Sequence, residues 1–276
     1  MNRPLVGFSM HPRWIYGSTL AGFLGRLRTA GLDALAFGLD AHDADWPCFE
    51  PMMDDCRLLG FSLCFHAPYK PPYTIAGFAG HGRANIEADY AAMLDVAARF
   101  GDTTVVIHGA QSATRPQQEL NADTVAFLRW ALGRYPSLTL ALENLVFDPD
   151  KVKIGADRTE VLRIVEEIND SRLGICWDLG HDVVNGCYDL PNQAWLQHIC
   201  HAHLHDVSDQ GVDHYPLIYG RVPIKAWLPA LLRAGFSGIV SLELKGGQLA
   251  SLEPEQIMEM LINSTSEVHR LLKIAS

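Results

Sequence analysis

Long apolar runs are missing from this 276-residue sequence. No uninterrupted apolar stretch approaches the roughly 18 residues that a membrane-spanning helix needs. The opening segment, MNRPLVGF, also lacks the extended apolar region of a secretory signal peptide. We therefore expect a protein that has no membrane contact and works in the cytoplasm.

Cysteine pairs are missing as well, because none of the six cysteines forms a CxxC motif or part of a regular framework. Cys64, Cys176 and Cys200 fall within predicted strands, where a cysteine usually behaves as a small buried apolar residue. We expect no disulfide framework of the kind found in secreted domains, which agrees with a reducing compartment.

Positive charge is scarce. The chain has 22 Lys and Arg against 32 Asp and Glu, so its formal net charge is −10. A nonspecific nucleic-acid binder needs a basic surface, so this balance argues against a nucleic-acid partner. No GxGxxG turn follows the first apolar run, which argues against a doubly wound dinucleotide-binding sheet.

The sequence does contain a regular alternation of strand-length apolar runs and helix-length amphipathic segments. The expected strands are 5–10, 34–39, 62–67, 104–109, 139–144, 173–178, 200–206 and 238–244. The clearest expected helices are 86–100, 117–133, 158–169, 224–234 and 254–273. Eight strands that are each followed by a helix predict an α/β protein, a single (β/α)8 TIM barrel over residues 1–276.

Six of the apolar runs end in side chains that bind metals or transfer protons. These residues are His66, His108, Glu143, Asp178, His203 with His205, and Glu243. Parallel strands closed into a barrel bring their C-terminal ends together at one mouth. The six strand ends therefore predict one polar site.

Three of these residues, Glu143, Asp178 and Glu243, would place three carboxylates in that mouth. Carboxylates so close together need protons or a cation to offset their repulsion. One divalent ion would change their formal charge from −3 to −1, and His203 would complete a four-ligand shell. Such donors suit Mn²⁺, Mg²⁺, Co²⁺, Fe²⁺ or Zn²⁺. The alternative is that each acid only caps the helix after its strand.

Strand alternation predicts which neighbours share the direction of these side chains, because successive residues point to opposite faces. Residues two positions before the strand-end groups should face the barrel interior, and the bulky residues between them should pack outward against helices. The inward set is Cys64, Val106, Ala141, Cys176, His201 and Ser241. We expect His201 to be a hydrogen-bonded interior histidine rather than a ligand.

The segment Asp178-Leu-Gly-His181 is the most specific local motif. Its spacing predicts that both side chains face one cavity across a tight turn, where His181 would hold a substrate oxygen or a second metal. A surface histidine in a loop is the alternative. His66 and His108 end neighbouring strands, and we expect them to act together.

These segments resemble the xylose-isomerase-like barrels, a family of sugar isomerases and epimerases that also includes endonuclease IV. The resemblance covers essentially the whole chain. Its motifs are FHAPY (65–69), VVIHGA (105–110), LALENL (140–145), GICWDLGHD (174–182), HAHLHDVSDQGVDHYPLIYG (201–220) and AGFSGIVSLEL (234–244). The resemblance implies that the shared ligands of a divalent metal cofactor are Glu143, Asp178, His203 and Glu243. His181 and His214 match further family histidines near the site.

The resemblance implies two chemistries, of which we expect the first. A metal-dependent isomerase or epimerase would move a carbon-bound proton of a small-molecule sugar or sugar phosphate through an enediolate, with Glu143 and Glu243 as the acid/base pair. The substrate contacts would be His66, His108, His181 and Arg221, with Trp14, Trp46 and Tyr69 as pocket walls or packing residues. Assembly as a homo-oligomer is left open.

The second chemistry is the hydrolysis of a phosphodiester in abasic DNA by a multi-zinc site, as in endonuclease IV. The ligands would be His66, His108, Glu143, Asp178, His181, His203, His214 and Glu243. The match departs from the nuclease in three places: Asp213 directly precedes His214, HGA replaces HPG at 108–110, and the loop after Glu143 reads NLVFDPD instead of a glycine-rich run. A non-catalytic, metal-stabilised sugar-binding barrel is a third alternative.

Overall fold

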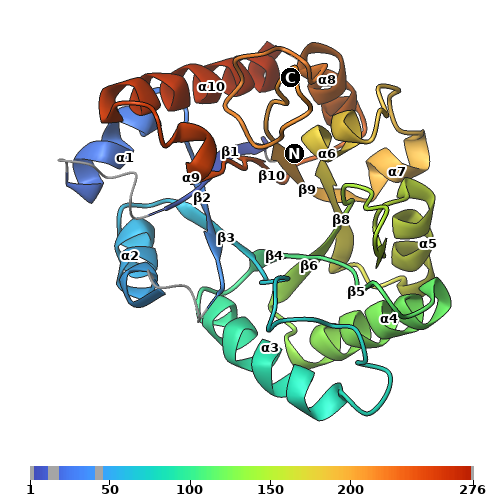
Figure 1. Cartoon of the computed structure of the whole chain (residues 1–276). Coiled ribbons are helices and arrows are strands. Elements are labelled where there is room, and N and C mark those ends of the chain that lie inside the picture. Colours follow the sequence, from blue (N-terminus) through green and yellow to red (C-terminus); the bar gives the residue numbers. More distant parts are fainter. Residues whose placement is uncertain (1–2, 12–18, 41–45, 275–276) are drawn as a thin grey trace.

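Eight parallel strands close into a barrel, as the sequence predicts. The computed structural model describes residues 3–11, 19–40 and 46–274. The strands are β1 (Leu5–Ser9), β2 (Ala34–Gly38), β3 (Ser62–His66), β4 (Thr103–Ile107), β6 (Leu138–Glu143), β8 (Leu173–Asp178), β9 (Ile199–Leu204) and β10 (Ile239–Leu242). They follow chain order around the ring, and β10 pairs with β1 to close it (Figure 1). The α/β class and the TIM-barrel architecture are confirmed.

Helices surround the barrel and separate successive strands (Figure 1). They are α1 (Leu20–Thr29), α2 (Trp46–Leu58), α3 (Arg83–Ala98), α4 (Gln117–Arg134), α5 (Arg158–Ile168), α6 (Leu179–Val184), α7 (Gln193–Gln197), α8 (Ile224–Arg233), α9 (Gly246–Leu249) and α10 (Pro254–Ile274). Among the described residues, none of the helices has the length and apolar character needed to cross a membrane.

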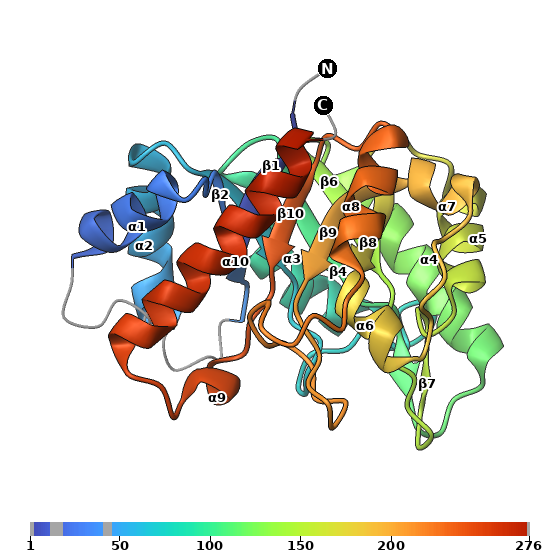
Figure 2. The ribbon, with the colours of Figure 1, turned by 90° about the horizontal axis from the view of Figure 1, so that it is seen from above.

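The two ends of the barrel differ. In the side view of Figure 2, the described chain begins and ends at one end, while the long loops that follow the strands gather at the other. The strands run toward this second end, so their C-terminal residues and the loops after them form one mouth. The strand-end side chains therefore lie on the face that the sequence predicts.

Small side chains fill the barrel interior, and bulky side chains pack outward. Val106, Ala141 and Cys176 form one interior cluster, and Cys64 belongs to a second one. The intervening bulky residues belong instead to the large core that the helices cover. These residues are Phe65, Ile107, Leu142, Trp177 and Leu242. The division follows the alternation predicted from the sequence.

A β-bulge between β8 and β9 decides which residue lies next to Asp178. The pairing shifts by one residue below the mouth: Ile175 pairs with Ile199, but Cys176 pairs with His201. The extra residue on β9 is Cys200, and its insertion pairs Asp178 with His203. Without the bulge the unshifted register would place Ala202 there, because a shift by one residue exchanges the two faces of a strand.

Several short elements were not predicted, and two features among them lie in the loops after the strands. β5 (Gln111–Ser112) and β7 (Val152–Lys153) form a separate antiparallel pair between loops that follow β4 and β6. Helix α6 begins directly after Asp178, where the sequence suggested a tight turn. A two-residue strand, and a six-residue helix of fewer than two turns, carry too little hydrophobic periodicity to be recognised in a sequence.

Gly238 lies tightly against β9, since a Cβ atom added there would overlap the backbone oxygen of Cys200. Only movement of a strand would relieve that overlap. Gly238→Ala is therefore expected to lower the free energy of unfolding by about 1–3 kcal/mol in urea denaturation. Gly133→Ala is the matched control, because Gly133 lies inside α4 and, apart from its own helix backbone and chain neighbours, no atom of the described residues lies within 4 Å of the added Cβ. The control should raise stability by about 0.5–1 kcal/mol, and equal effects would contradict this account of the β9–β10 contact.

Candidate metal centre

The four side chains predicted to bind a metal lie together at the barrel mouth. Glu143 and Asp178 end β6 and β8, His203 lies one residue before the end of β9, and Glu243 directly follows β10. One potential ligand atom from each of the four lies within 4.8 Å of the others. Glu143 and Asp178 are 0% exposed and His203 is 2% exposed, so water does not offset their charges.

Three carboxylates converge on a single nitrogen atom of His203. Its Nδ1 lies 3.1 Å from Glu243 Oε2, 3.4 Å from Glu143 Oε1 and 3.9 Å from Asp178 Oδ2. One ring N–H cannot donate to three acceptors at once. Despite the short distance, buried Oε2 of Glu243 has no hydrogen-bond partner among the described residues. A cation between the four side chains would give these oxygens a partner.

Opposing influences set the charges in this cluster. Burial favours the protonated forms of Glu143 and Glu243, but nearby histidines, chiefly His108 for Glu143 and His203 for Glu243, hold both pKa values well below the usual range. Burial also opposes charge on His203, yet Cys176, Glu243 and Glu143 raise its pKa well above the usual value. Positive charge on His203 therefore offsets part of the acidic charge when no cation does so.

His66 and His108 lie beside Glu143, as expected for neighbouring strand ends. Their Nε2 atoms are 3.2 and 3.0 Å from Glu143 Oε2, and the three residues form a second group of close ligand atoms. Burial lowers the pKa of His108, whereas in His66 the effect of burial is outweighed by Glu143, which raises the pKa. Tyr69 stacks on the His108 ring at a centroid distance of 3.9 Å and lines the mouth, as predicted.

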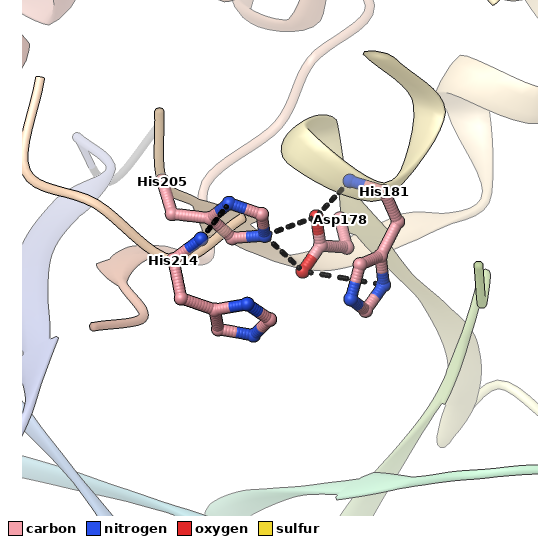
Figure 3. Close-up of side chains that lie close together, drawn as sticks. All are labelled: Asp178, His181, His205 and His214. Carbon is pink, nitrogen blue, oxygen red and sulfur yellow. Dashed lines mark hydrogen bonds and ion pairs between the residues drawn. The ribbon is translucent and has the colours of Figure 1, made fainter. Parts of the chain in front are cut away.

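Asp178 uses its two oxygens differently (Figure 3). Oδ1 accepts a hydrogen bond from the backbone N–H of His181 at 2.7 Å and so caps helix α6. Oδ2 lies 3.4 Å from His181 Nδ1 and is the oxygen nearest His203. Asp178 therefore does cap the helix that follows its strand, which was the alternative to metal binding. The cap uses only Oδ1, and Oδ2 still faces the site. His181 faces the same space as Asp178, as its motif predicts.

His205 holds Asp178 in place, a role that the sequence did not reveal. Its Nδ1 accepts a hydrogen bond from the backbone N–H of His214 at 2.9 Å, so a neutral ring carries its proton on Nε2. Nε2 lies 3.1 and 3.2 Å from the two oxygens of Asp178 (Figure 3). A side chain at position 180 would overlap the His205 ring, which explains the glycine in the Asp-Leu-Gly-His motif. Such outer contacts orient the carboxylates that bind metals.

His214 reaches the site from the long loop after β9. Its backbone is left-handed, with a φ of 62°, a conformation that is strained for a histidine. Its ring stacks on His205 at 4.1 Å, and its Nε2 lies 3.5 Å from Glu243 Oε2. Burial opposes charge on His214, but Asp213 and Glu243 raise its pKa to about 9. Asp213 pairs with His214 at 2.7 Å and with Lys245 at 3.2 Å, and it belongs to no candidate metal group within the described chain.

Arg221 is turned away from the mouth, contrary to the sequence-based expectation. Buried Asp206 accepts hydrogen bonds from the three backbone N–H groups of residues 219–221, at 2.6, 2.6 and 3.0 Å. These bonds fix the backbone so that the guanidinium is exposed and contacts Asp209 and the Tyr188 hydroxyl at 3.4 and 3.3 Å. Arg221 lines neither of the mouth cavities formed by the described residues.

Three further expectations have different outcomes. Trp46 begins α2 and packs against Phe49, so it is a packing residue rather than a wall of the mouth. His201 is buried in the barrel as predicted, but neither ring nitrogen has a hydrogen-bond partner among the described residues. Trp14 lies outside the described residues.

Two adjoining cavities open at the mouth, with volumes of about 270 and 300 Å³. They share Tyr69, Lys70, His214, Glu243 and Lys245. The first extends past His66 and His203 toward apolar Leu39 and Leu244. The second contains Glu143, His108 and His181. The candidate metal ligands thus border a space of the size that proteins use to bind small molecules.

Comparison with known proteins assigns the family. A family model described as xylose isomerase-like TIM barrel matches residues 24–265. The chain belongs to this family. The resemblance seen in the motifs is therefore confirmed. A search of curated proteins found no match.

Similar solved structures share the fold over almost their full lengths. An L-ribulose 3-epimerase has a TM-score of 0.68 at 15% identity, covering 100% of this chain and 96% of that one. A D-psicose 3-epimerase from Clostridium cellulolyticum H10, determined with D-tagatose, has a TM-score of 0.67 at 13% identity and covers 98% of each chain. A D-psicose 3-epimerase in the presence of D-fructose gives 0.71 at 12% identity, with 97% and 99% covered. At these identities the likeness establishes the fold.

Replacing Asp206 should release the loop that ends at Arg221. Asp206→Ala removes the acceptor of three successive backbone N–H groups, so hydrogen exchange at the amides of residues 219–221 should accelerate by about 10- to 100-fold, as expected when hydrogen bonds to a charged group are lost. Asp209→Ala is the matched control in the same loop, because the ion-pair partner of Asp209 among the described residues is the exposed Arg221 side chain, at 3.4 Å. Unchanged exchange in Asp206→Ala would show that Asp206 does not hold the loop.

Proposed function

We propose that this protein is a divalent-metal-dependent isomerase or epimerase of a sugar or sugar phosphate, acting by proton transfer through an enediolate. The observation that carries the proposal is the convergence of Glu143, Asp178 and Glu243 on His203 Nδ1, beside cavities of small-molecule size. Family membership and folds shared with L-ribulose and D-psicose 3-epimerases support the same chemistry.

The donor set fits a divalent cation. Glu143, Asp178, His203 and Glu243 would hold the ion, and Mn²⁺, Mg²⁺, Co²⁺, Fe²⁺ and Zn²⁺ all accept oxygen-rich donors with one imidazole. The buried Oε2 atom of Glu243, which has no hydrogen-bond partner among the described residues, supports this fit. When bound, the ion would supply Lewis-acid polarisation of substrate oxygens, which acidifies the neighbouring carbon-bound proton.

Glu143 and Glu243 are the proposed acid/base pair. They come from the ends of β6 and β10, which β8 and β9 separate in the ring, so they approach the mouth from different sides. One would remove the proton from the substrate carbon, and the other would deliver a proton to the opposite face. Although burial opposes charge, the neighbouring histidines hold the pKa of each glutamate well below its usual range, so each is ionised and can accept a proton from the substrate carbon.

His181 would position a substrate oxygen. Its Nδ1 lies 2.9 Å from the backbone oxygen of Asn144, to which it would donate a hydrogen bond. Nε2 is then left for the substrate, in the cavity that also contains Glu143 and His108. Asn144 itself bridges the ends of β6 and β8, because its side chain both donates to Asp178 O and accepts from Asp178 N.

A second candidate is multi-zinc phosphodiester hydrolysis, which one observation favours. The ligand atoms form overlapping groups: His66, His108 and Glu143 on one side, and Asp178, His181, His205 and His214 on the other. One feature favours the isomerase instead. Asp213, the aspartate beside His214 in the nuclease match, pairs with His214 and Lys245. Three zinc ions per chain and nicking of an abasic duplex would establish the nuclease.

Removing the divalent ion with a chelator should abolish turnover, and adding Mn²⁺ or Co²⁺ should restore it.

Because His205 orients Asp178, His205→Ala is expected to weaken Mn²⁺ binding by about 10- to 100-fold in isothermal titration calorimetry. His198→Ala is the matched control, since His198 directly precedes β9, at the end of the strand away from the mouth, and has Glu166 as its ion-pair partner at 4.0 Å. Full activity of the metal-free protein would rule out the proposed mechanism.

Proton transfer at carbon should incorporate solvent deuterium into the product when the reaction runs in D2O. Glu143→Gln and Glu243→Gln should each lower the rate of incorporation by about 10²–10⁴-fold, the usual contribution of a general acid or base. Glu259→Gln, an exposed glutamate on α10, should leave the rate unchanged. Product formation without deuterium at the reacting carbon, measured by NMR, would instead indicate a hydride shift.

A further inference from the structure

Four lysines border the second mouth cavity, in a chain whose net charge is −10. We call them the lysine rim: Lys70, Lys151, Lys153 and Lys245. They come from three separate loops, after β3, β6 and β10. All three loops lie at the mouth, so barrel closure collects these positive charges around one small space.

The lysine rim carries an excess of positive charge. Asp148 lies 3.7 Å from Lys151 and 3.4 Å from Lys153, and Asp213 lies 3.2 Å from Lys245. Lys70 has no carboxylate within ion-pair distance in the described part of the chain, and its Nζ lies 5.7 Å from the Tyr69 ring centre. The lysines and their two aspartate partners give +4 − 2 = +2 at the rim, while Glu143 and Glu243, which also line the cavity, would be offset by the proposed divalent ion. Partly exposed ion pairs of this kind are weak, so an anionic ligand can compete for the lysines.

The small β5–β7 sheet holds part of the lysine rim in place. Gln111 of β5 pairs directly with Lys153 of β7, and both residues line the cavity. The Lys153 side chain is only 17% exposed, and its Nζ donates to the backbone oxygen of Val146 at 3.0 Å. A Cβ atom at Gly109 would overlap the backbone oxygen of Ile154, so this glycine permits the close approach of the two loops. Lys153 is therefore fixed by the fold rather than left on a free loop.

We propose that the substrate of this site is a phosphorylated sugar whose phosphate binds the lysine rim. The inference rests on the proposed function. The cavity extends from Glu143 and Glu243, where proton transfer would occur, to the lysines at its edge. A phosphate monoester carries a charge of about −1.5 to −2 at neutral pH, which matches the +2 of the rim. Lysine ammonium groups bind phosphate as point charges, without the fixed geometry that arginine requires.

An abasic duplex fits this surface less well. A duplex carries phosphates along its whole length and needs an extended basic face. The four lysines instead surround one cavity of about 300 Å³. The rim therefore favours a single phosphate on a small molecule, and duplex nicking is an outcome that the test must include.

Steady-state kinetics of the metal-loaded enzyme test the proposal with matched substrates: a ketopentose with and without a 5-phosphate, and a ketohexose with and without a 6-phosphate. The phosphorylated form should have a kcat/KM at least about 100-fold higher, since hydrogen bonds to charged groups contribute this much in two or more contacts. Lys153→Ala and Lys70→Ala should each raise its KM by about 10- to 100-fold with little change in kcat. Each variant should raise the KM of the neutral sugar much less, because that sugar has no phosphate for the lysine to bind.

Lys225 is an exposed lysine on α8, outside the mouth, so Lys225→Ala is the matched control. It should leave kcat/KM unchanged for both the phosphorylated and the neutral sugar. Preference for the neutral sugar, or for a sugar acid of the same length, would overturn the phosphate assignment while the proposed function stands. If no sugar is turned over, or if an abasic duplex is nicked, the proposed function fails. Calorimetry with inorganic phosphate then tests the phosphate site by itself. Phosphate binding to the unaltered protein that is lost in the Lys70→Ala/Lys153→Ala double variant would support the site. Binding that is unchanged in the double variant, or absent from the unaltered protein, would overturn it.

Discussion

Glu143, Asp178 and Glu243 stand at the ends of three barrel strands, and closure of the barrel brings their carboxylates to within a few ångströms of one another. Because Glu143 and Asp178 are fully buried, their repulsion is not screened by water and has to be offset locally. His203 supplies one partial solution, with all three carboxylates within 3.9 Å of its Nδ1. A divalent cation bound between these side chains would offset more of the charge. The histidines, cavities and loops of the mouth are arranged around this concentration of charge.

The fold keeps these charges in position by several independent devices. The bulge at Cys200 sets the register that pairs Asp178 with His203. Gly180 leaves room for His205, which contacts both oxygens of Asp178. The strained backbone at His214 delivers its N–H to His205 and thereby fixes the proton on the side that faces Asp178. A carboxylate held from several sides loses little further freedom when a ligand binds, which is the benefit of preorganisation.

The sequence predicts the barrel and its four candidate metal ligands because both depend on short-range patterns. Buried strands read as apolar runs, and the residue at the end of each run must lie at the mouth, so Glu143, Asp178, His203 and Glu243 were placed correctly beside one another. Features that depend on tertiary contacts were missed. Arg221 is turned outward by hydrogen bonds from its loop to Asp206, and the β5–β7 pair has only two residues per strand. The sequence did not predict the lysine rim, because its four lysines come from three separate loops that only the folded barrel brings together.

The position of a bound metal tests the central claim most directly. In crystals grown with Mn²⁺, anomalous scattering should show one strong peak per chain, within coordinating distance of Glu143, Asp178, His203 and Glu243. That result would establish that the convergence of carboxylates on His203 is a single-metal centre. Three peaks, with two near His66 with His108 and near His181 with His214, would contradict the account in favour of the multi-zinc alternative. The absence of any peak among these four residues would contradict it altogether.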